Sequence, residues 1–108
     1  SRIIIYKDNI DNIIGYVHST EQFKMPVSIK SMLIPVSIVP ESMSGIKLLE
    51  DFIDKKRSVS VVVDEYGGTS GILTMEDIME VKNNEHLKEI LKYRMSNYLA
   101  CNFSVRIL

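Results

Sequence analysis

The chain has 108 residues, of which 45% are apolar and 25% are charged, and its formal net charge is −1. This composition supports a hydrophobic core in one domain or in two small interlocked subdomains. The near-neutral charge argues against broad binding to nucleic acids or anionic membranes, which requires a strongly basic face. Because Cys101 is the only cysteine, an intrachain disulfide is excluded and a reducing compartment is expected.

Membrane insertion of this chain is not expected from its sequence. No apolar run approaches the roughly 18 residues that are needed to span a bilayer, and no signal peptide is recognisable. We therefore expect that any membrane anchor of the protein lies outside this chain. Two local basic groups, Arg2 with Lys7 and residues 55–57, could still contact phosphate.

The N-terminal segment predicts two strands followed by the start of a helix. Residues 3–5 are all isoleucine, and β-branched residues favour the half-buried setting of a strand. A turn is expected around Asp8, because Asp and Asn are common turn residues. A second strand is expected to open at Gly15, and His18 and Glu21 follow at the expected start of a helix.

The middle of the chain predicts an extended segment followed by an amphipathic helix. Pro35 and Pro40 bound an apolar stretch at 36–39. Ser42 is expected to be the helix N-cap, since its hydroxyl can accept a bond from a free N–H of the first turn. Apolar residues then recur at helical spacing with charged residues between them: Met43, Ile46, Leu48, Leu49, Phe52 and Ile53.

The segment 64–78 is the most informative about function. An apolar strand ending at residues 61–63 leads into a turn at Gly67 and Gly68, which we interpret as hairpin glycines. A second strand returns, and a helix opens on Thr74-x-x-Asp77. This places a hydroxyl, a carboxylate and free N–H groups at a helix N-terminus, which suits a ribose and its phosphate.

The same spacing has a purely structural interpretation. Thr74-x-x-Asp77 resembles a capping box, in which the two side chains satisfy free N–H groups of the first helical turn. Spacing alone favours capping over ligand binding, and both can hold because a ligand can displace a cap. Asp64 and Glu65 are adjacent on an extended segment, so a turn role is favoured over a catalytic pair. No Cys or His spacing suits zinc.

An internal repeat links the two halves of the chain. Aligning Gly15 with Gly71, an offset of 71 − 15 = 56, matches the flanks without gaps and places residues 3–5 on residues 59–61. Repeats indicate one supersecondary unit used twice, so two copies packed around a pseudo-two-fold axis are expected. The second copy is complete, whereas the first begins at its second strand, which gives one and a half repeats.

The last part of the chain predicts a further helix and a strand. The helix is indicated by the apolar spacing of Leu87, Ile90, Leu91 and Met95. The strand is indicated by alternation at Cys101, Phe103, Val105 and Ile107.

Residues 64–78, read as Asp-Glu-Tyr-Gly-Gly-Thr-x-Gly-x-x-Thr-x-Glu-Asp-Ile, resemble the second CBS motif of CorC/HlyC-type proteins, bacterial relatives of the CNNM magnesium transporters. Ser1-Arg2-x-x-x-Tyr6-x-Asp8 and the stretch 14–18 are similar to the first CBS motif. The resemblance implies an α+β fold, a pair of β-α-β-β-α repeats with the first truncated at its N-terminus. The expected division is 1–26 for the first repeat, 27–81 for the second and 82–108 for an extension.

The resemblance also implies a ligand, ATP or AMP with or without Mg²⁺, bound between the repeats. By motif position, Thr74 meets the ribose or phosphate and Asp77 meets the ribose hydroxyls. The strand that contains Ser37, Ile38 and Val39 offers backbone groups to the adenine.

In the first repeat, Arg2 is a candidate phosphate contact and His18 a polar residue beside the cleft. His18 and Glu21 stand where the second repeat has Thr74 and Asp77, so a second nucleotide site is not expected.

The implied role is regulatory and not enzymatic. The CBS pair is expected to form a homodimer through its repeats, at the cytoplasmic face of the inner membrane, attached to a membrane domain outside this chain that transports magnesium or cobalt. Two alternatives remain open, a ligand-free structural dimerisation module and a small hydrolase acting on nucleotides. Neither a nucleophile–base pair nor a nucleotide-hydrolysis motif supports the hydrolase.

Overall fold

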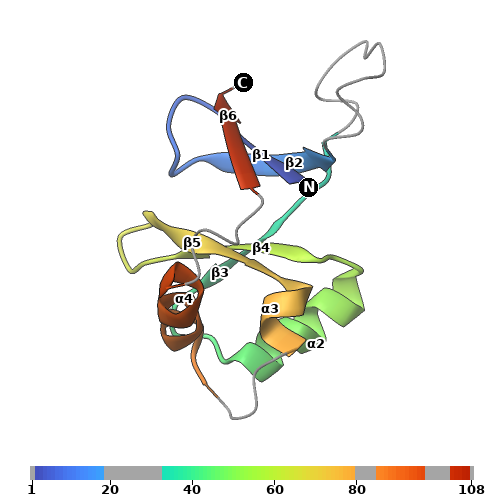
Figure 1. Ribbon diagram of the computed structural model, residues 1–108, viewed down its shortest axis with the longest axis vertical. Coiled ribbons are helices and arrows are strands. Elements are labelled where there is room, and N and C mark those ends of the chain that lie inside the picture. The colour runs from blue at the N-terminus through green and yellow to red at the C-terminus, as the bar shows by residue number, and fades with distance from the viewer. Residues whose placement is uncertain (1, 19–32, 80–84, 97–102, 108) are drawn as a thin grey trace. The chain divides into compact units, whose positions relative to one another are not determined.

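The computed structural model describes residues 2–18, 33–79, 85–96 and 103–107 (Figure 1). The chain divides into two compact units. Unit 1 comprises Ser1–Pro35 with Cys101–Leu108, and unit 2 comprises Val36–Ala100. The mixed α+β class predicted from the sequence is confirmed. Within the described residues, no helix has the length and apolar character required to cross a membrane.

Unit 2 is built on a three-stranded sheet in the order β3-β4-β5. The strands are β3 (Ser37–Pro40), β4 (Val59–Val63) and β5 (Thr69–Thr74). β3 runs parallel to β4, and β4 runs antiparallel to β5. The helices are α2 (Gly45–Lys55), α3 (Met75–Met79) and α4 (Leu87–Ser96).

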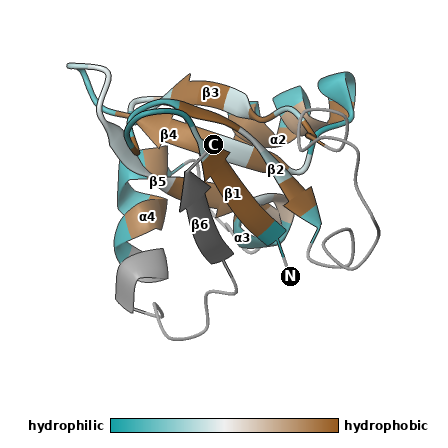
Figure 2. Cartoon of the chain, turned by 90° about the horizontal axis from the view of Figure 1, so that it is seen from above, coloured by the Kyte–Doolittle hydropathy of each residue, from teal (hydrophilic) through white to brown (hydrophobic). Residues whose placement is uncertain are grey.

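The core of unit 2 lies between one face of this sheet and the helices. β4 is the central strand, and its residues 59–62 are buried, which accounts for the apolar run at residues 61–63. Figure 2 shows β3 and β4 coloured mainly as hydrophobic. The buried core cluster consists of Val39, Leu48, Phe52, Val62, Leu73, Ile78, Leu87, Ile90 and Leu91.

Helix α2 begins two residues later than predicted. The expected N-cap Ser42 is wrong, because the cap is Ser44, which has an extended backbone and whose hydroxyl accepts a bond from the Lys47 N–H at 3.1 Å. The C-cap that follows the helix, Lys56, has the left-handed conformation, φ 54°. The Arg57 N–H then donates to the Phe52 carbonyl at 3.0 Å, which satisfies one of the last free carbonyls.

The two serines give a matched pair of substitutions. Replacing Ser44 by alanine removes the capping acceptor, so we expect the free energy of unfolding to fall by about 1 kcal/mol. The Ser42→Ala variant removes a hydroxyl that caps nothing, and it is expected to change that free energy by less than about 0.5 kcal/mol. Urea unfolding monitored by circular dichroism compares them, and equal losses would refute this cap assignment.

The predicted helix at residues 87–95 is confirmed as α4, and it is an integral part of unit 2. Main-chain bonds join the start of α4 to the residues that precede α2. The Leu87 N–H donates to the Met43 carbonyl at 2.8 Å, and the Lys88 N–H donates to the Glu41 carbonyl at 3.1 Å. Leu91 packs on β5 at Gly71, where an added Cβ would lie 2.6 Å from a Leu91 methyl carbon. A glycine at this position therefore permits close packing of α4 on the sheet.

Unit 1 contains a second three-stranded sheet, in the order β2-β1-β6. Its strands are β1 (Arg2–Tyr6), β2 (Ile13–His18) and β6 (Phe103–Ile107), which confirms the predicted C-terminal strand. β1 is antiparallel to β2 and parallel to β6. In unit 2, β4 likewise has an antiparallel neighbour, β5, and a parallel neighbour, β3. The last strand thus takes the position in its sheet that β3 takes in unit 2.

The predicted repeat is real, but its gapless alignment is wrong in one strand. Ile5 pairs with Gly15 and Val62 pairs with Gly71, so the separations are 15 − 5 = 10 and 71 − 62 = 9. Residues 3–5 therefore correspond to residues 60–62 and not to 59–61. The first hairpin contains one residue more than the second. The sequence alignment therefore assigns each residue of β1 to the wrong partner in β4, and a shift of one residue corresponds to the opposite face of the strand.

The proposed division into 1–26, 27–81 and 82–108 describes repeats, and the compact units follow a different division. The second unit starts at Val36, and the expected extension is shared between the units, with α4 in unit 2 and β6 in unit 1. Glu21 lies outside the described residues.

Candidate functional site

The junction of β5 and α3 brings Thr74 and Asp77 into direct contact. One oxygen of the Asp77 carboxylate, Oδ2, accepts bonds from the Thr74 N–H at 2.8 Å and from the Thr74 hydroxyl at 3.0 Å. The carboxylate therefore reaches back to the N–H of the residue before the helix, which is one of the two bonds of the predicted capping box. The same contact orients a hydroxyl and a carboxylate side by side.

The position of this pair is fixed by the sheet. Thr74 is the last residue of β5, lies opposite Val59 at the start of β4, and is buried. The next residue, Met75, donates its N–H to the Ser58 carbonyl at 2.9 Å. The pair thus lies at the end of the sheet where β3 and β4 begin.

Ser37 opens β3 at this same end of the sheet. Its carbonyl accepts a bond from the Ser60 hydroxyl at 3.2 Å. Its own hydroxyl is buried and has no hydrogen-bond partner among the described residues. Because a buried hydroxyl without a partner costs stability, each such group calls for an explanation, and a polar ligand atom could supply the partner.

The rest of β3 alternates between the core and the open face of the sheet. Val39 is buried with Ser37, whereas the Ile38 side chain is 63% exposed. Within the described residues, β3 pairs with β4 alone and forms an edge of the sheet. An edge strand has N–H and C=O groups that no neighbouring strand pairs with. A planar base can form hydrogen bonds to such groups through its own donors and acceptors.

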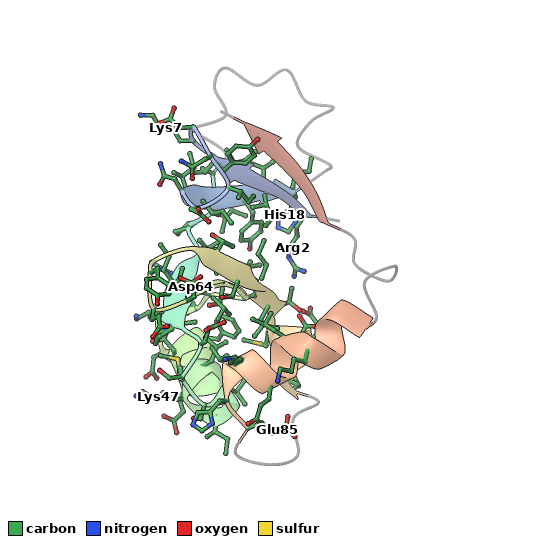
Figure 3. The ribbon with its side chains drawn as sticks, turned by 90° about the vertical axis from the view of Figure 1, so that its left-hand side faces the viewer. Arg2, Lys7, His18, Lys47, Asp64 and Glu85 are labelled. Carbon is green, nitrogen blue, oxygen red and sulfur yellow. The ribbon has the colours of Figure 1, made fainter. Side chains whose placement is uncertain are left out.

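Unit 1 brings Arg2 and His18 together. They are direct partners in the β1–β2 ladder, and the Tyr16 ring lies beside both side chains. The Arg2 guanidinium carbon is 6.0 Å from the centre of the Tyr16 ring, and the Tyr16 and His18 rings meet edge-to-face at 5.7 Å. Figure 3 shows Arg2 and His18 extending from neighbouring strands. Because the guanidinium can contact the π-face of Tyr16, the cluster combines a permanent positive charge with aromatic surface.

The predicted residues therefore form two groups, each within one unit. Thr74, Asp77 and β3 belong to unit 2, and Arg2 and His18 belong to unit 1. Sequence reasoning missed Tyr16, although its position two residues before His18 on a strand indicates a shared face. It also missed the Ser37 hydroxyl, since only the backbone of that residue was expected to take part.

Asp64 has the turn role that was favoured over catalysis. Its Oδ1 accepts bonds from the N–H groups of Tyr66 and Gly68, both at 2.9 Å. Gly67 has a φ of 84°, a conformation that glycine adopts at little cost. No cluster of three or more His, Cys, Asp or Glu side chains that could hold a metal ion occurs in the described part of the chain.

Comparison with known proteins identifies the family. Residues 28–84 match the CBS domain family. Hemolysin C of Brachyspira hyodysenteriae is 42% identical over 83 residues, which cover 74% of this chain and 31% of that protein. The chain thus spans less than a third of this relative's length in the match.

Two solved structures that are similar to this chain contain a bound nucleotide. The CBS domain of the bacterial CNNM/CorC family Mg²⁺ transporter in complex with ATP is 31% identical, with a TM-score of 0.65 over 74% of this chain and 61% of that one. A CBS-domain pair with bound AMP from Klebsiella pneumoniae is 31% identical, with a TM-score of 0.58 over 73% of this chain and 68% of that one.

Proposed function

This chain belongs to the CBS-domain family, and from that premise we propose that it is a regulatory module that binds ATP or AMP. The observation that carries the proposal is the Thr74–Asp77 contact, which places a hydroxyl and a carboxylate together at 3.0 Å. Carboxylates accept two hydrogen bonds from a cis-diol, and such charge-assisted bonds are stronger than neutral ones. Nucleotide complexes of similar CBS domains, one with ATP and one with AMP, support the choice of ligand.

Each part of the nucleotide has an assigned partner in this proposal. Asp77 binds the ribose hydroxyls, and Thr74 binds the ribose or the first phosphate. The backbone of Ser37, Ile38 and Val39 binds the adenine, and the buried Ser37 hydroxyl gains a partner. Ile38 supplies exposed apolar surface on which a base can lie.

Arg2 and His18 are assigned to the phosphates. Arg2 carries a permanent charge beside His18 in the ladder, and guanidinium groups bind phosphate well because their donors form a planar fork. In the described residues no carboxylate cluster suits a metal. Mg²⁺, where present, is assigned to the nucleotide phosphates, as is usual for this ion.

The proposed role of binding is regulation of ion transport. A similar CBS domain is part of a bacterial CNNM/CorC family Mg²⁺ transporter, and we assign this chain to the cytoplasmic side of a magnesium or cobalt transport protein. A nucleotide that binds one arrangement of the module more tightly shifts its population. Because the nucleotide binds one arrangement more tightly than the other, its binding would also change the conformational equilibrium of an attached membrane domain.

Calorimetric titration tests the proposal. The chain is titrated with ATP, with ATP and Mg²⁺, and with AMP, beside the double variant Thr74→Ala, Asp77→Ala. We expect saturable binding by the wild-type chain. The double variant is expected to bind at least about tenfold more weakly, because the hydrogen bonds of the Thr74 hydroxyl and the Asp77 carboxylate to the nucleotide are lost. Equal affinity of both proteins would place the ligand elsewhere.

A structural dimerisation module is the second candidate, and one observation favours it. Ile46 and Ile53 are 52% and 63% exposed, and because they are seven residues apart they lie on the same side of α2. Met79 of α3 is also 69% exposed. This apolar surface suits a homodimer through the helices, which we also include in the nucleotide proposal. A dimer by sedimentation that binds no nucleotide would favour the second candidate.

A further inference from the structure

A groove of about 700 Å³ lies on unit 2, at the end of the sheet opposite to Thr74. Its residues come from the ends of β3 and β4, the turns that follow them, and α4: Pro40, Glu41, Ser42, Val63, Asp64, Glu65, His86, Lys88, Glu89 and Lys92. This volume falls in the range of sites that bind small molecules or short chain segments. None of these residues belongs to the proposed nucleotide site.

Main-chain and side-chain bonds hold the groove in shape. Its two sides are joined where the Lys88 N–H donates to the Glu41 carbonyl at 3.1 Å. The Glu41 carboxylate accepts the Ser70 hydroxyl at 2.7 Å, and the Asp64 carboxylate accepts the N–H groups that close the β4–β5 turn. The groove is therefore formed before a ligand arrives, which lowers the entropic cost of binding.

The charges on the two sides differ in sign. The strand side carries the carboxylates of Glu41, Asp64 and Glu65. The α4 side carries Lys88 and Lys92, one helical turn apart, with Glu89 and His86. Within the described residues, the side chains of both lysines and of the exposed Glu65 and Glu89 form no hydrogen bond or ion pair. Charges of opposite sign thus face one groove without neutralising each other.

An exposed aromatic ring adjoins the acidic side. Tyr66 follows Glu65 at the tip of the β4–β5 turn and is 88% exposed. The turn that presents it is held by Asp64, as described above. Exposed, rigidly presented tyrosines are typical binding anchors, and their rings attract cations. Figure 1 shows this turn and α4 on the same side of unit 2.

We propose that this groove binds a short extended peptide segment that carries one basic and one acidic side chain. The basic side chain lies against Glu65 and Tyr66, and the acidic side chain lies against Lys88 and Lys92. Pro40 and Val63 provide apolar contact to the segment between them. Charge complementarity selects this ligand, because a segment of one charge sign would meet repulsion on one side of the groove.

The test uses capped tetrapeptides and the full chain. The dipolar probe is acetyl-Arg-Gly-Gly-Glu-amide, whose charged residues can separate by about 10 Å, and the comparison probe is acetyl-Arg-Gly-Gly-Arg-amide. Binding is measured from amide chemical shifts in ¹⁵N-labelled protein. We expect the dipolar probe to bind about tenfold more tightly, with saturable shifts at Glu65, Lys88 and Lys92.

Charge reversal makes the test specific. In the Lys88→Glu, Lys92→Glu variant the groove is acidic on both sides, so the preference should invert toward the dicationic probe. The matched control is Lys47→Glu, Lys55→Glu, which makes the same change of net charge on α2, outside the groove, and should keep the wild-type preference. No saturable shift with either probe, or the same preference in the variant and the control, would overturn the proposal. Nucleotide binding is measured separately, so each proposal can fail alone.

Discussion

Replacing Phe52 by alanine is expected to lower the free energy of unfolding of unit 2 by about 3–5 kcal/mol. Phe52 is fully buried on α2, in one cluster with residues of β4, β5, α3 and α4. Its removal deletes apolar contacts and leaves a cavity, and both losses add. Because domains of this size are stable by about 5–15 kcal/mol, unit 2 would be close to unfolding at moderate temperature.

The neighbouring residue provides the control. Ile53 lies on the same helix but is 63% exposed, so Ile53→Ala is expected to change the free energy of unfolding of the monomer by less than about 0.5 kcal/mol. Urea unfolding of dilute protein, monitored by circular dichroism, measures both. If the Ile53 variant lost as much as the Phe52 variant, the orientation of α2 described above would be wrong.

The second large effect concerns Asp77. Replacing Asp77 by asparagine is expected to weaken ATP binding about 10- to 100-fold, because a hydrogen bond to a charged group contributes about 1.5–3 kcal/mol. Asparagine retains an oxygen that can accept from the Thr74 N–H and hydroxyl. The helix cap is therefore largely kept, and the free energy of unfolding should fall by less than about 1 kcal/mol.

This substitution separates the two interpretations of the Thr74–Asp77 pair. Calorimetry gives the affinity for ATP, and urea unfolding gives the stability of the same sample. Asp54→Asn serves as the control, since it makes the same change at an exposed carboxylate of α2 and should leave both quantities nearly unchanged. A large loss of stability with unchanged ATP affinity would show that Asp77 is a cap and not a ligand.

Much of unit 2 could be predicted because its patterns are local. The spacing of Leu48 and Phe52 predicts α2, the all-apolar strand before Asp64 predicts β4, and the helical spacing at Leu87 and Leu91 predicts α4. Each depends on which residues favour a helix or strand and on which face is buried. The turn role of Asp64 was also accessible, since Asp often bonds to backbone N–H groups two residues on.

The features that were missed depend on contacts between distant residues. Ser42 and Ser44 are both good caps, and the choice follows from where α4 docks, because the Gly45 N–H donates to the Glu85 carbonyl at 2.8 Å. The parallel pairing of β6 with β1 joins the two ends of the chain, which no local pattern indicates. The one-residue shift between the repeats is set by the length of a hairpin turn, which an alignment on Gly15 conceals.

The candidate site shows the same division. The pairing of Thr74 with Asp77 follows from a spacing of three residues at a helix start. The contact of Arg2 with Tyr16 and the burial of the Ser37 hydroxyl arise only when strands are placed side by side. Side-chain contacts within one helical turn can be predicted from the spacing in the sequence. Contacts between side chains of different strands can be predicted only when the pairing register of the strands is known.

A crystal structure of this chain grown with ATP tests the central claim most directly. The account predicts that the ribose hydroxyls lie within hydrogen-bond distance, about 2.7–3.2 Å, of the Asp77 carboxylate, with the adenine against the backbone of β3. A nucleotide bound at another place, with Thr74 and Asp77 bonded only to each other, would contradict it.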